Sequence, residues 1–406
     1  MNDIQFIPGG ITAPPGFTAS GVHCGIRRNK TKRDLALILA DVPCAAAAVY
    51  TTNIVKAAPI NLTIEHLSDG KARAILVNSG NANACAPGGM EAAQECVNTA
   101  AAALGLNPAD IIVNSTGVIG QPLPFEIIVR AIPELVEGLS EDSEPAAEAI
   151  MTTDTFSKSA AIKCNIGGKT VIIGGIAKGS GMIHPNMATM LAFLTTDCSI
   201  TPHLLQEALR DSANCTYNRI SVDGDTSTND MTAILASGAA GNPQIIKKDT
   251  DYDAFLTALN AINLKLAKDI AKDGEGATKL ITCKVCGASS EETAVTIAKS
   301  VISSSLVKSA MFGADANWGR VLCAMGYSGA GFDTAKVDVA FLSKSGRIDV
   351  CKQSMGLEFD EERAKAILSR SDVTIEILLA DGTAFAEAYG CDLTYDYVRI
   401  NGDYRT

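Results

Sequence analysis

Residues 178–197, KGSGMIHPNMATMLAFLTTD, contain the pattern on which the prediction of fold and function depends. A glycine-rich loop leads through Pro185 into Ala188 and Thr189, and the apolar run that follows is typical of a buried strand. A small residue before a hydroxyl residue, at the junction of a loop and a strand, is what self-cleavage of a chain requires. The hydroxyl group attacks the preceding carbonyl, an N-to-O acyl shift follows, and water hydrolyses the ester.

Cleavage between Ala188 and Thr189 would leave a new N-terminal threonine. Its α-amine, with a pKa of about 7.7–8.0, can serve as the general base for its own hydroxyl, so this chemistry needs no histidine. The chain has only 4 histidines, and no two of them are spaced four residues apart. An Ala-Thr pair at a strand start is nevertheless a common sequence, so these residues alone do not separate a cleavage site from an ordinary turn.

Composition restricts the class of protein. The chain has 406 residues and a net charge of −11, and 47% of its residues are hydrophobic, which excludes a largely disordered chain. The absence of a basic tract and an aromatic content of 5% argue against a nucleic-acid partner. The start MNDIQFIPGG is unlike a secretory signal, and Asp41 and Pro43 interrupt the most apolar region, so we expect a cytoplasmic protein without a membrane partner.

The cysteines are expected to be reduced and structural. There are 12 of them, far fewer than in a disulfide scaffold, and most lie in apolar runs. The single Cys-x-x-Cys pair, Cys283 and Cys286, lies in a segment that alternates like a strand, so its two sulfurs would point to opposite faces. No second pair follows it, and we therefore expect no metal site.

Helix and strand patterns alternate throughout, which predicts an α/β (α+β) protein. A boundary near residue 280 divides it into a main domain, 1–280, and a smaller C-terminal α/β domain, 281–406. Four polar segments, NSGNAN (78–83), NSTG (114–117), KGSG (178–181) and DGEG (273–276), are expected to be loops. Predicted helices cover 90–104, 124–139, 144–151, 201–214, 253–272, 291–307 and 361–368, and predicted strands cover 111–113, 158–165, 169–176, 190–196, 279–285, 336–342 and 373–379.

Nine ordered blocks, spread over nearly the whole chain, give the sequence a wider resemblance. They are residues 16–21, 77–84, 114–120, 151–155, 178–191, 221–230, 273–279, 314–320 and 401–406. In these blocks the chain resembles the ornithine acetyltransferases, the glutamate N-acetyltransferases of the cyclic arginine pathway. The resemblance implies a self-processing fold of stacked sheets flanked by helices, an α chain of 1–188, a β chain from 189, and an α2β2 assembly.

The resemblance also implies an activity and a set of site residues. Thr189 would accept the acetyl group of N2-acetyl-L-ornithine and pass it to L-glutamate in a ping-pong reaction, with Thr116 and Gly117 forming the oxyanion hole. No cofactor is implied, and the use of acetyl-CoA as a second acetyl donor is left open. The implied substrate-binding residues are Thr153, Lys178, Thr189, Glu275, Asn401 and Thr406. The resemblance thus makes 1–280 the main catalytic domain and implies that the tail of 281–406 returns to the active site.

Two alternatives remain at this point. An N-terminal-nucleophile amidase or aminopeptidase would share the nucleophile and the oxyanion hole but pass the acyl group to water. A self-cleaving structural protein would use Thr189 only once. It would have no need for a cationic partner such as Lys178 beside the nucleophile.

Overall fold

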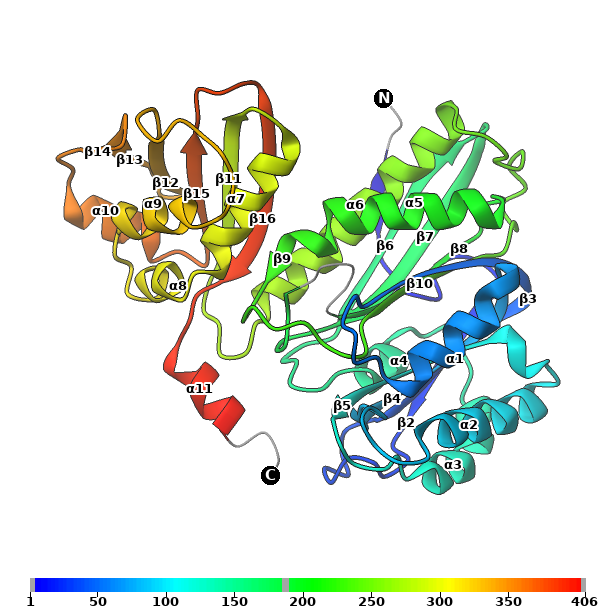
Figure 1. Ribbon diagram of the computed structural model, residues 1–406. Coiled ribbons are helices and arrows are strands. Elements are labelled where there is room, and N and C mark those ends of the chain that lie inside the picture. The colour runs from blue at the N-terminus through cyan, green and yellow to red at the C-terminus, as the bar shows by residue number, and fades with distance from the viewer. Residues whose placement is uncertain (1–3, 185–189, 403–406) are drawn as a thin grey trace. The chain divides into compact units, whose positions relative to one another are not determined.

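The computed structural model describes residues 4–184 and 190–402 (Figure 1). The chain divides into two compact units. The first comprises Met1–Gly179, Pro185–Asn218 and Thr226–Ala267, and the second comprises Ser180–His184, Arg219–Asp225 and Lys268–Thr406. Each unit is described by itself below. The division into domains 1–280 and 281–406 stays a prediction.

The first unit is built on a mixed sheet of nine strands in the described part of the chain, in the order β1-β6-β7-β8-β10-β3-β4-β5 with β2 paired to β3. Two of its pairs, β8 with β10 and β4 with β5, are parallel, and the others are antiparallel. The strands are β1 Gln5–Ile7, β2 Phe17–Val22, β3 Leu35–Tyr50, β4 Lys71–Asn81, β5 Ile111–Val118, β6 Lys158–Ile166, β7 Lys169–Lys178, β8 Leu191–Thr196 and β10 Met231–Ala236.

Helices cover both faces of this sheet because successive residues of β3 point to opposite sides. Leu35 and Leu37 pack with residues of α2 and α3, such as Val97, whereas Ala36 and Ile38 belong to a core on the other face. This is the pattern of a sheet buried on both sides. The helices of the first unit are α1 Ala58–His66, α2 Gly89–Leu104, α3 Phe125–Glu137, α4 Glu144–Ala149, α5 Pro202–Cys215 and α6 Thr250–Lys272, of which α6 continues into the second unit.

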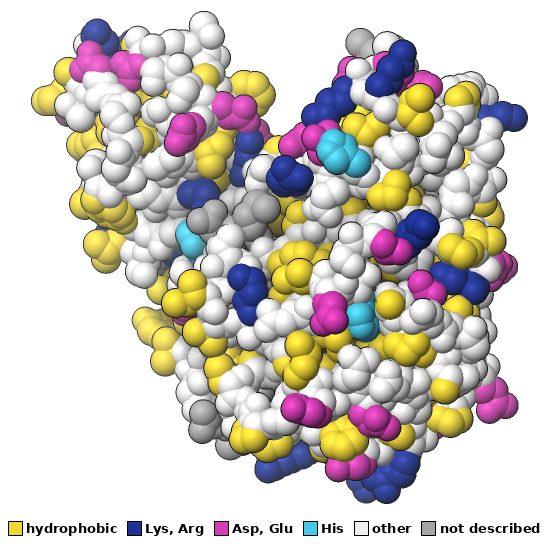
Figure 2. Space-filling view, turned by 45° about the vertical axis from the view of Figure 1, so that its right-hand side comes forward, with side chains coloured by type: hydrophobic (Ala, Val, Ile, Leu, Met, Phe, Trp, Pro, Cys, Tyr) yellow, Lys and Arg dark blue, Asp and Glu magenta, His cyan; other side chains and the backbone are white. Residues whose placement is uncertain are grey.

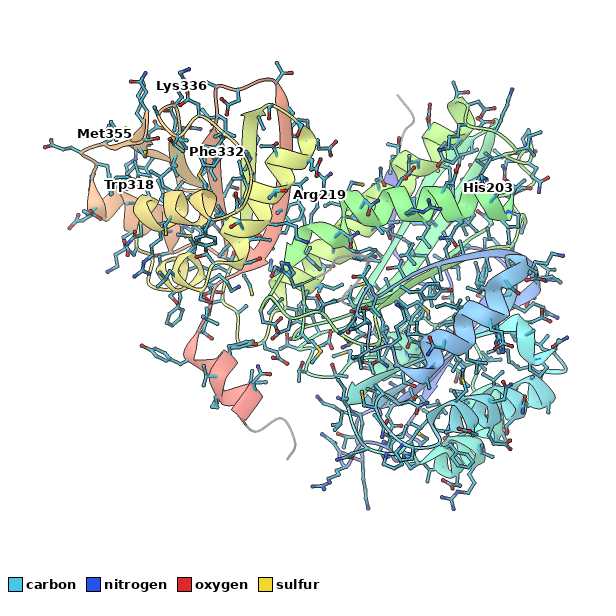
Figure 3. All side chains as sticks on the ribbon, viewed as in Figure 1. His203, Arg219, Trp318, Phe332, Lys336 and Met355 are labelled. Carbon is cyan, nitrogen blue, oxygen red and sulfur yellow. The ribbon has the colours of Figure 1, made fainter. Side chains whose placement is uncertain are left out.

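The second unit has its own sheet, in the order β14-β13-β12-β15-β11-β16-β9. The helices α7 and α9 contribute to its apolar core, and α7 contacts β11 and β16. Trp318 of α9 lies close to β14, where a Cβ on Gly356 would come within 2.5 Å of the indole ring (Figure 3). The elements are β9 Ile220–Ser221, β11 Leu280–Ala288, α7 Glu291–Ser303, α8 Ser305–Phe312, α9 Trp318–Gly326, β12 Asp338–Ser343, β13 Gly346–Lys352, β14 Met355–Gly356, α10 Glu361–Leu368, β15 Asp372–Leu378, β16 Ala384–Cys391 and α11 Tyr395–Gly402.

The predicted α/β class, with sheets flanked by helices, is confirmed. The strands predicted over 158–165 and 169–176 are β6 and β7, which pair antiparallel. The helix predicted over 361–368 is α10, which Asp360 caps through the N–H groups of Glu362 and Arg363. The helix predicted over 291–307 is wrong in one respect, because it is two helices, α7 and α8, divided at Ser304, whose side chain caps α8.

Two of the four segments predicted to be loops lie in strands instead, so the loop prediction is wrong for them. The segment 114–117 lies in β5, and most of 78–83 lies in β4. These strand ends are polar because their side chains bond to one another and to backbone groups in the interior, whereas the sequence pattern alone associates such composition with turns.

Charged side chains of both signs lie on the surface, and seven of the cysteines are buried, whereas Cys85 and Cys323 are exposed. Basic and acidic side chains are interspersed over the face shown in Figure 2, with no patch of one sign. All 12 cysteines are free thiols, and burial raises the pKa of Cys283 well above its usual value. Within residues 4–184 and 190–402 no group of side chains could hold a metal ion, and no helix there has the length and apolar character needed to cross a membrane.

Candidate functional site

Thr116 and Gly117 lie near the end of β5, alongside the end of β4. The parallel register pairs Ser79 with Thr116 and Gly80 with Gly117. Gly117 has a φ of +134°, and a Cβ there would lie 2.3 Å from the carbonyl carbon of Gly80. Only glycine fits this close approach of two backbones, so the two strands fix the position of the Gly117 N–H group.

Lys178, the last residue of β7, reaches the same strand end. Its side chain is 7% exposed, and its Nζ donates a hydrogen bond to Oγ1 of Thr116 over 3.4 Å. A hydroxyl oxygen that accepts from an ammonium group keeps its own proton for donation elsewhere. Together with the Gly117 N–H group, this arrangement is chemically suited to stabilise a negative charge developing on a substrate oxygen.

Asp154 joins two lysines, Lys158 and Lys178, into a buried ionic cluster. Its Oδ1 accepts from Lys158 Nζ at 2.7 Å and from the Gly179 N–H group at 2.7 Å, and its Oδ2 accepts from the Thr152 N–H group at 2.9 Å. Burial raises the pKa of Asp154, but the charges of Lys178 and Lys158 outweigh it and hold that pKa well below its usual value. The Asp154 carboxylate is therefore ionised at neutral pH, and it holds the backbone directly after Lys178.

A second buried aspartate, Asp230, has its pKa shifted in the opposite direction from that of Asp154. Asp230 immediately precedes β10 and is 3% exposed. Burial raises its pKa well above the usual value, although the charge of Lys178 and hydrogen bonds from Ser227 oppose the rise. Among the described residues its Oδ2 has no hydrogen-bond partner. Burial without a partner for this oxygen therefore favours the neutral form of the Asp230 carboxyl group, in contrast to the Asp154 carboxylate.

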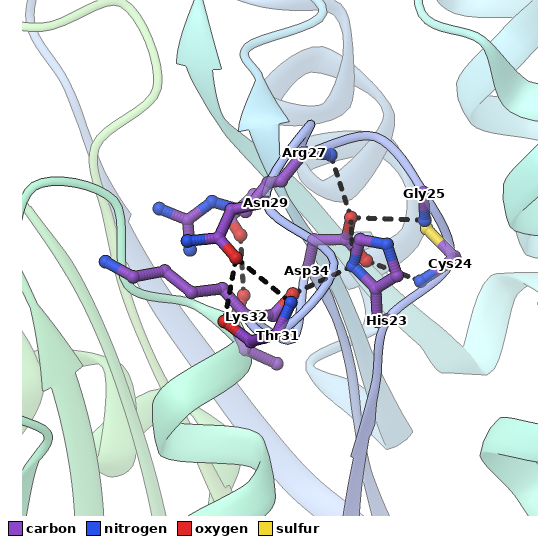
Figure 4. Close-up of polar contacts among 10 residues, drawn as sticks. His23, Cys24, Gly25, Arg27, Asn29, Thr31, Lys32 and Asp34 are labelled. Atoms are coloured by element: carbon purple, nitrogen blue, oxygen red, sulfur yellow. Dashed lines mark hydrogen bonds and ion pairs between the residues drawn. The ribbon is translucent and has the colours of Figure 1, made fainter.

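Thr153 lies in the bend between α4 and β6, and its neighbours are firmly held. Asp34 anchors a loop through the backbone N–H groups of Cys24 and Arg27, at 2.6 and 2.9 Å (Figure 4). Arg27 of that loop donates through Nη2 to the carbonyl oxygen of Thr152 at 2.6 Å. Thr152 therefore has both its carbonyl and its N–H group fixed, which restricts the backbone that presents Thr153.

In the second unit, Glu275 and Asn401 form a pair. Asn401 Nδ2 donates to Glu275 Oε2 at 2.6 Å, and the backbone N–H group of Glu275 donates to the carbonyl oxygen of Ser180 at 2.9 Å. A Cβ on Gly181 would lie 2.4 Å from the Glu275 carboxyl group, so the segment 180–184 needs glycine at this point. Glu275 is 5% exposed, and its contact with Asn401 joins α11 to the segment 273–276.

The same segment, 180–184, is fixed by Asp223. The Asp223 carboxylate accepts from the backbone N–H groups of Met182 and Ile183 at 2.6 and 2.8 Å. Met182 has a φ of +57°, which is uncommon for a residue other than glycine, and the two hydrogen bonds stabilise that conformation. Burial, followed by the charges of Asp223 and Glu275, raises the pKa of Tyr397 well above its usual value.

Comparison with known proteins identifies the family. A sequence model described as the ArgJ family matches residues 18–406. The chain belongs to the ArgJ family. It is 52% identical to the arginine biosynthesis bifunctional protein ArgJ of Symbiobacterium thermophilum over 406 residues, covering 99% of this chain and 100% of that protein. It is 51% identical to ArgJ 1 of Clostridium acetobutylicum over 398 residues, covering 98% of this chain and 97% of that protein.

A solved structure of an ArgJ protein is also similar. The crystal structure of the arginine biosynthesis bifunctional protein ArgJ from Bacillus halodurans matches with a TM-score of 0.50 and 48% sequence identity. The match covers 52% of this chain and 97% of that chain. Hence the crystallised ArgJ chain that matches is about half as long as the present one.

In this ArgJ-family chain, the structure brings some of the predicted site residues together. Thr116, Gly117 and Lys178 meet in the first unit, and Thr153 is the sequence neighbour of Asp154 there. Glu275 and Asn401 meet in the second unit. Ala188, Thr189 and Thr406 lie outside the described residues.

The sequence reasoning missed the residues that support this site. Asp154, Asp230 and Asn229 were seen only as members of polar blocks, and Arg27 and Asp34 were not singled out. A signal was present, because polar residues beside apolar runs are buried here and need partners. The partners, however, are distant in sequence, so only the fold identifies them.

Proposed function

We propose that this protein transfers the acetyl group of N2-acetyl-L-ornithine to L-glutamate in arginine biosynthesis. The proposal is supported by membership of the ArgJ family and by the full-length match to proteins named for arginine biosynthesis. The contact between Lys178 and Thr116 is the structural observation on which it rests. It provides a hydroxyl donor beside a buried cation, as acyl transfer through an oxyanion requires.

The proposed reaction proceeds by two related steps on Thr189, freed as an N-terminus by cleavage after Ala188. Its hydroxyl oxygen attacks the acetyl carbonyl carbon while its α-amine takes the hydroxyl proton. The carbonyl oxygen becomes an oxyanion that Gly117 N–H and Thr116 Oγ–H stabilise. Ornithine leaves with the proton, an acetyl ester remains on Thr189, and the amine of glutamate attacks that ester to complete the exchange.

The proposed substrate contacts follow from charge. Ornithine and glutamate both have an α-carboxylate, for which the Lys178 ammonium is a suitable partner. The Glu275 carboxylate is suited to an amino group of ornithine, and its bond to Asn401 fixes its orientation. Thr153 and Thr406 complete the proposed set by polar contacts. Water has to be excluded from this set, because it would otherwise hydrolyse the ester.

Self-cleavage and assembly are part of the same proposal. The β chain 189–406 would contain just over half of the sequence, and the similar ArgJ crystal chain is matched over 97% of its length by 52% of this chain. The two chains would stay together as α2β2 in the cytoplasm. The reaction needs no cofactor, because a threonine side chain holds the acetyl group, and acetyl-CoA would enter only as a second acetyl donor.

Intact mass spectrometry of the purified protein tests the nucleophile. We expect two chains, 1–188 and 189–406, and one acetyl group on the second chain after incubation with N2-acetyl-L-ornithine alone. A Thr189→Ala variant should remain a single chain without activity. A Thr201→Ala variant, changed at the residue before α5, should be cleaved normally. An intact chain in fully active wild-type protein would overturn the proposal.

The rate of ornithine release, measured with and without glutamate, separates transfer from hydrolysis. We expect glutamate to increase sustained ornithine release strongly, because it regenerates free Thr189 faster than water does. Equal rates with and without glutamate would identify an amidase instead. The same assay with acetyl-CoA and glutamate shows whether a second donor is used.

A further inference from the structure

Asn229 links the ends of two neighbouring strands by a single side chain. It lies just before β10 and is 3% exposed. Its Nδ2 donates to the carbonyl oxygen of Ala82 at 2.6 Å and to the carbonyl oxygen of Ser115 at 2.8 Å. Ala82 directly follows β4 and Ser115 lies in β5, so one amide group connects the two strand ends beside Thr116.

The chemical identity of this side chain is fixed by its partners. Carbonyl oxygens only accept hydrogen bonds, so the atom between Ala82 and Ser115 has to be a nitrogen with two hydrogens. The Asn229 Oδ1 accepts a hydrogen bond from the Thr228 hydroxyl group. The Asn229 carbonyl oxygen in turn accepts a hydrogen bond from Asn114 Nδ2 at 2.9 Å. This bond holds the backbone of Asn229 in place.

The bond to Ser115 acts directly on the proposed oxyanion hole. The Ser115 carbonyl belongs to the peptide group that joins Ser115 to Thr116, and that group is planar. Fixing its oxygen therefore fixes the plane in which the Thr116 nitrogen and Cα lie. The bond to Ala82 acts on the other side, because Gly80, two residues earlier, lies against Gly117.

These bonds belong to a wider amide network, which comprises Asn78, Asn114, Ser115 and Asn229. Ser115 Oγ donates to Asn78 Oδ1 at 2.6 Å, and Asn78 Nδ2 donates to the carbonyl oxygen of Asn81 at 2.9 Å. All members are buried, and none carries a charge. The network therefore fixes geometry without adding an electric charge beside Thr116.

We infer that Asn229 is a positioning residue of the transfer reaction: its amide group holds Thr116 and Gly117 in the geometry that stabilises the oxyanion. The inference rests on the proposed function, since it assigns Asn229 a role in that reaction. Asn229 has no assigned contact with substrate. It acts through the Ser115 carbonyl and through the end of β4.

An Asn229→Asp variant tests the inference with almost no change of shape. The substitution removes both donors and places a carboxylate oxygen against two carbonyl oxygens, so the strand ends have to separate. We expect kcat to fall about 100-fold for ornithine release and for acetyl transfer to glutamate alike, because small displacements of reacting groups cost this much. The KM for each substrate should change less than about threefold, because Asn229 does not bind substrate.

Asn242 supplies a matched control in the same unit. It is also a buried asparagine whose Nδ2 donates to two carbonyl oxygens, those of Ser199 at 3.2 Å and Pro243 at 2.8 Å. None of its hydrogen-bond partners belongs to the proposed site. We expect Asn242→Asp to lower thermal stability but to leave kcat within about twofold of the wild-type value. An equal loss of kcat in both variants would overturn the inference.

A double variant separates positioning from general stability. In a Thr116→Ala background the hydroxyl donor is absent, so Asn229→Asp should lower kcat by no more than about tenfold, well below its effect in the wild type. Independent effects would instead multiply, which would contradict a role through Thr116. If Asn229→Asp does not fold, Asn114→Ala removes the bond to the Asn229 carbonyl and the bond from the Ser115 N–H group to Asn114 Oδ1, both within the amide network, and should lower kcat with unchanged KM. Unchanged kcat in that folded variant would overturn the inference.

These experiments also distinguish a failure of the inference about Asn229 from a failure of the proposed function. If the wild-type protein does not transfer acetyl groups, the proposed function itself is wrong. If the wild-type protein is active and Thr116→Ala lowers kcat while Asn229→Asp does not, only the inference about Asn229 fails.

Discussion

The amide network and the ionic cluster reach Thr116 from different strands and are built from different chemistry. The amide network joins the ends of β4 and β5 through neutral side chains, with every donor directed at a carbonyl or amide oxygen. The ionic cluster joins the start of β6 and the end of β7 through the Asp154 carboxylate and two ammonium groups. Both are buried, so neither relies on water for its hydrogen bonds.

The difference shows how a site separates two requirements of acyl transfer. Position is set by amides, whose hydrogen bonds do not change with pH in the range of enzyme assays. Charge is supplied by the ionic cluster, where Lys158 and Asp154 balance each other and Lys178 faces Thr116. Substitutions in the amide network should therefore displace the hydrogen-bond donors Thr116 and Gly117. Substitutions in the ionic cluster should change the electrostatics at Thr116 and the stability of the fold.

The largest effect on stability is expected for Asp154→Asn in the ionic cluster. The variant leaves two buried ammonium groups without their shared carboxylate, which typically costs about 3–5 kcal/mol. Urea unfolding at pH 7 measures this as a loss in the free energy of unfolding. Asp251→Asn is the control, because the Asp251 carboxylate also accepts a backbone N–H group, that of Gly167 at 3.0 Å, but lies at the surface. A similarly small loss in both variants would show that the cluster is not a charge-paired unit.

A smaller loss is expected for Gly117→Ala where the two strands approach. The new methyl group would lie 2.3 Å from the Gly80 backbone, at a φ that disfavours side chains, and we expect a cost of about 2–3 kcal/mol with a fall in kcat. Gly105→Ala is a matched control, since Gly105 also has a positive φ, +66°, but nothing lies within 4 Å of its Cβ position. The control should cost about 1 kcal/mol. Equal melting temperatures for the two variants would show that the close approach is unimportant.

The smallest effect is a dependence on pH, and it distinguishes the two buried aspartates. Burial raises the pKa of Asp230 in the folded state above its unfolded value of about 3.9, so the folded protein binds more protons. Its contribution to stability is present below the unfolded pKa and is lost as the pH rises toward the folded pKa, by up to about 1.4 kcal/mol per pH unit. Asp230→Asn should remove this slope, and over one pH unit above pH 4 it should gain at most about 1.4 kcal/mol relative to the wild type.

The pKa of Asp154 is shifted in the opposite direction, so its contribution to stability depends on pH in the opposite way. Its pKa in the folded state is lowered, so its contribution is complete above about pH 4 and is lost only as the pH falls toward the folded pKa. The difference between Asp154→Asn and the wild type should therefore stay constant from pH 5 to pH 8. Urea unfolding at several pH values above 4 compares both variants. A pH dependence of Asp154→Asn, relative to the wild type, that equals that of Asp230→Asn would contradict the opposite pKa shifts of the two carboxyl groups.

Much of the fold could be predicted from local signals, and the supporting shell of the site could not. Gly105 ends α2 by its left-handed backbone, and the predicted helices 90–104 and 361–368 agree with the bounds of α2 and α10 to within one residue. Asn114 and Asn78 were assigned to loops because buried polar residues in a strand have the composition of a turn. The partners that join different strands are over 30 residues away, as for Ser115 with Asn78 and Asn229 with Ala82.

The amide bridge at Asn229 also has a consequence for the chemical ageing of the protein. Asparagine residues deamidate when the following backbone nitrogen attacks the side-chain carbon and expels ammonia, and such residues are among the heat-sensitive ones in proteins. At Asn229 the departing nitrogen is tied to two oxygens in a rigid interior, so the folded state protects it. Hydrolysis of the cyclic imide formed there yields isoaspartate and aspartate, and the aspartate product is the Asn229→Asp substitution used to test the inference. Storage conditions that preserve the fold should therefore also preserve turnover, and material that has unfolded for long periods should return with intact folding but impaired turnover.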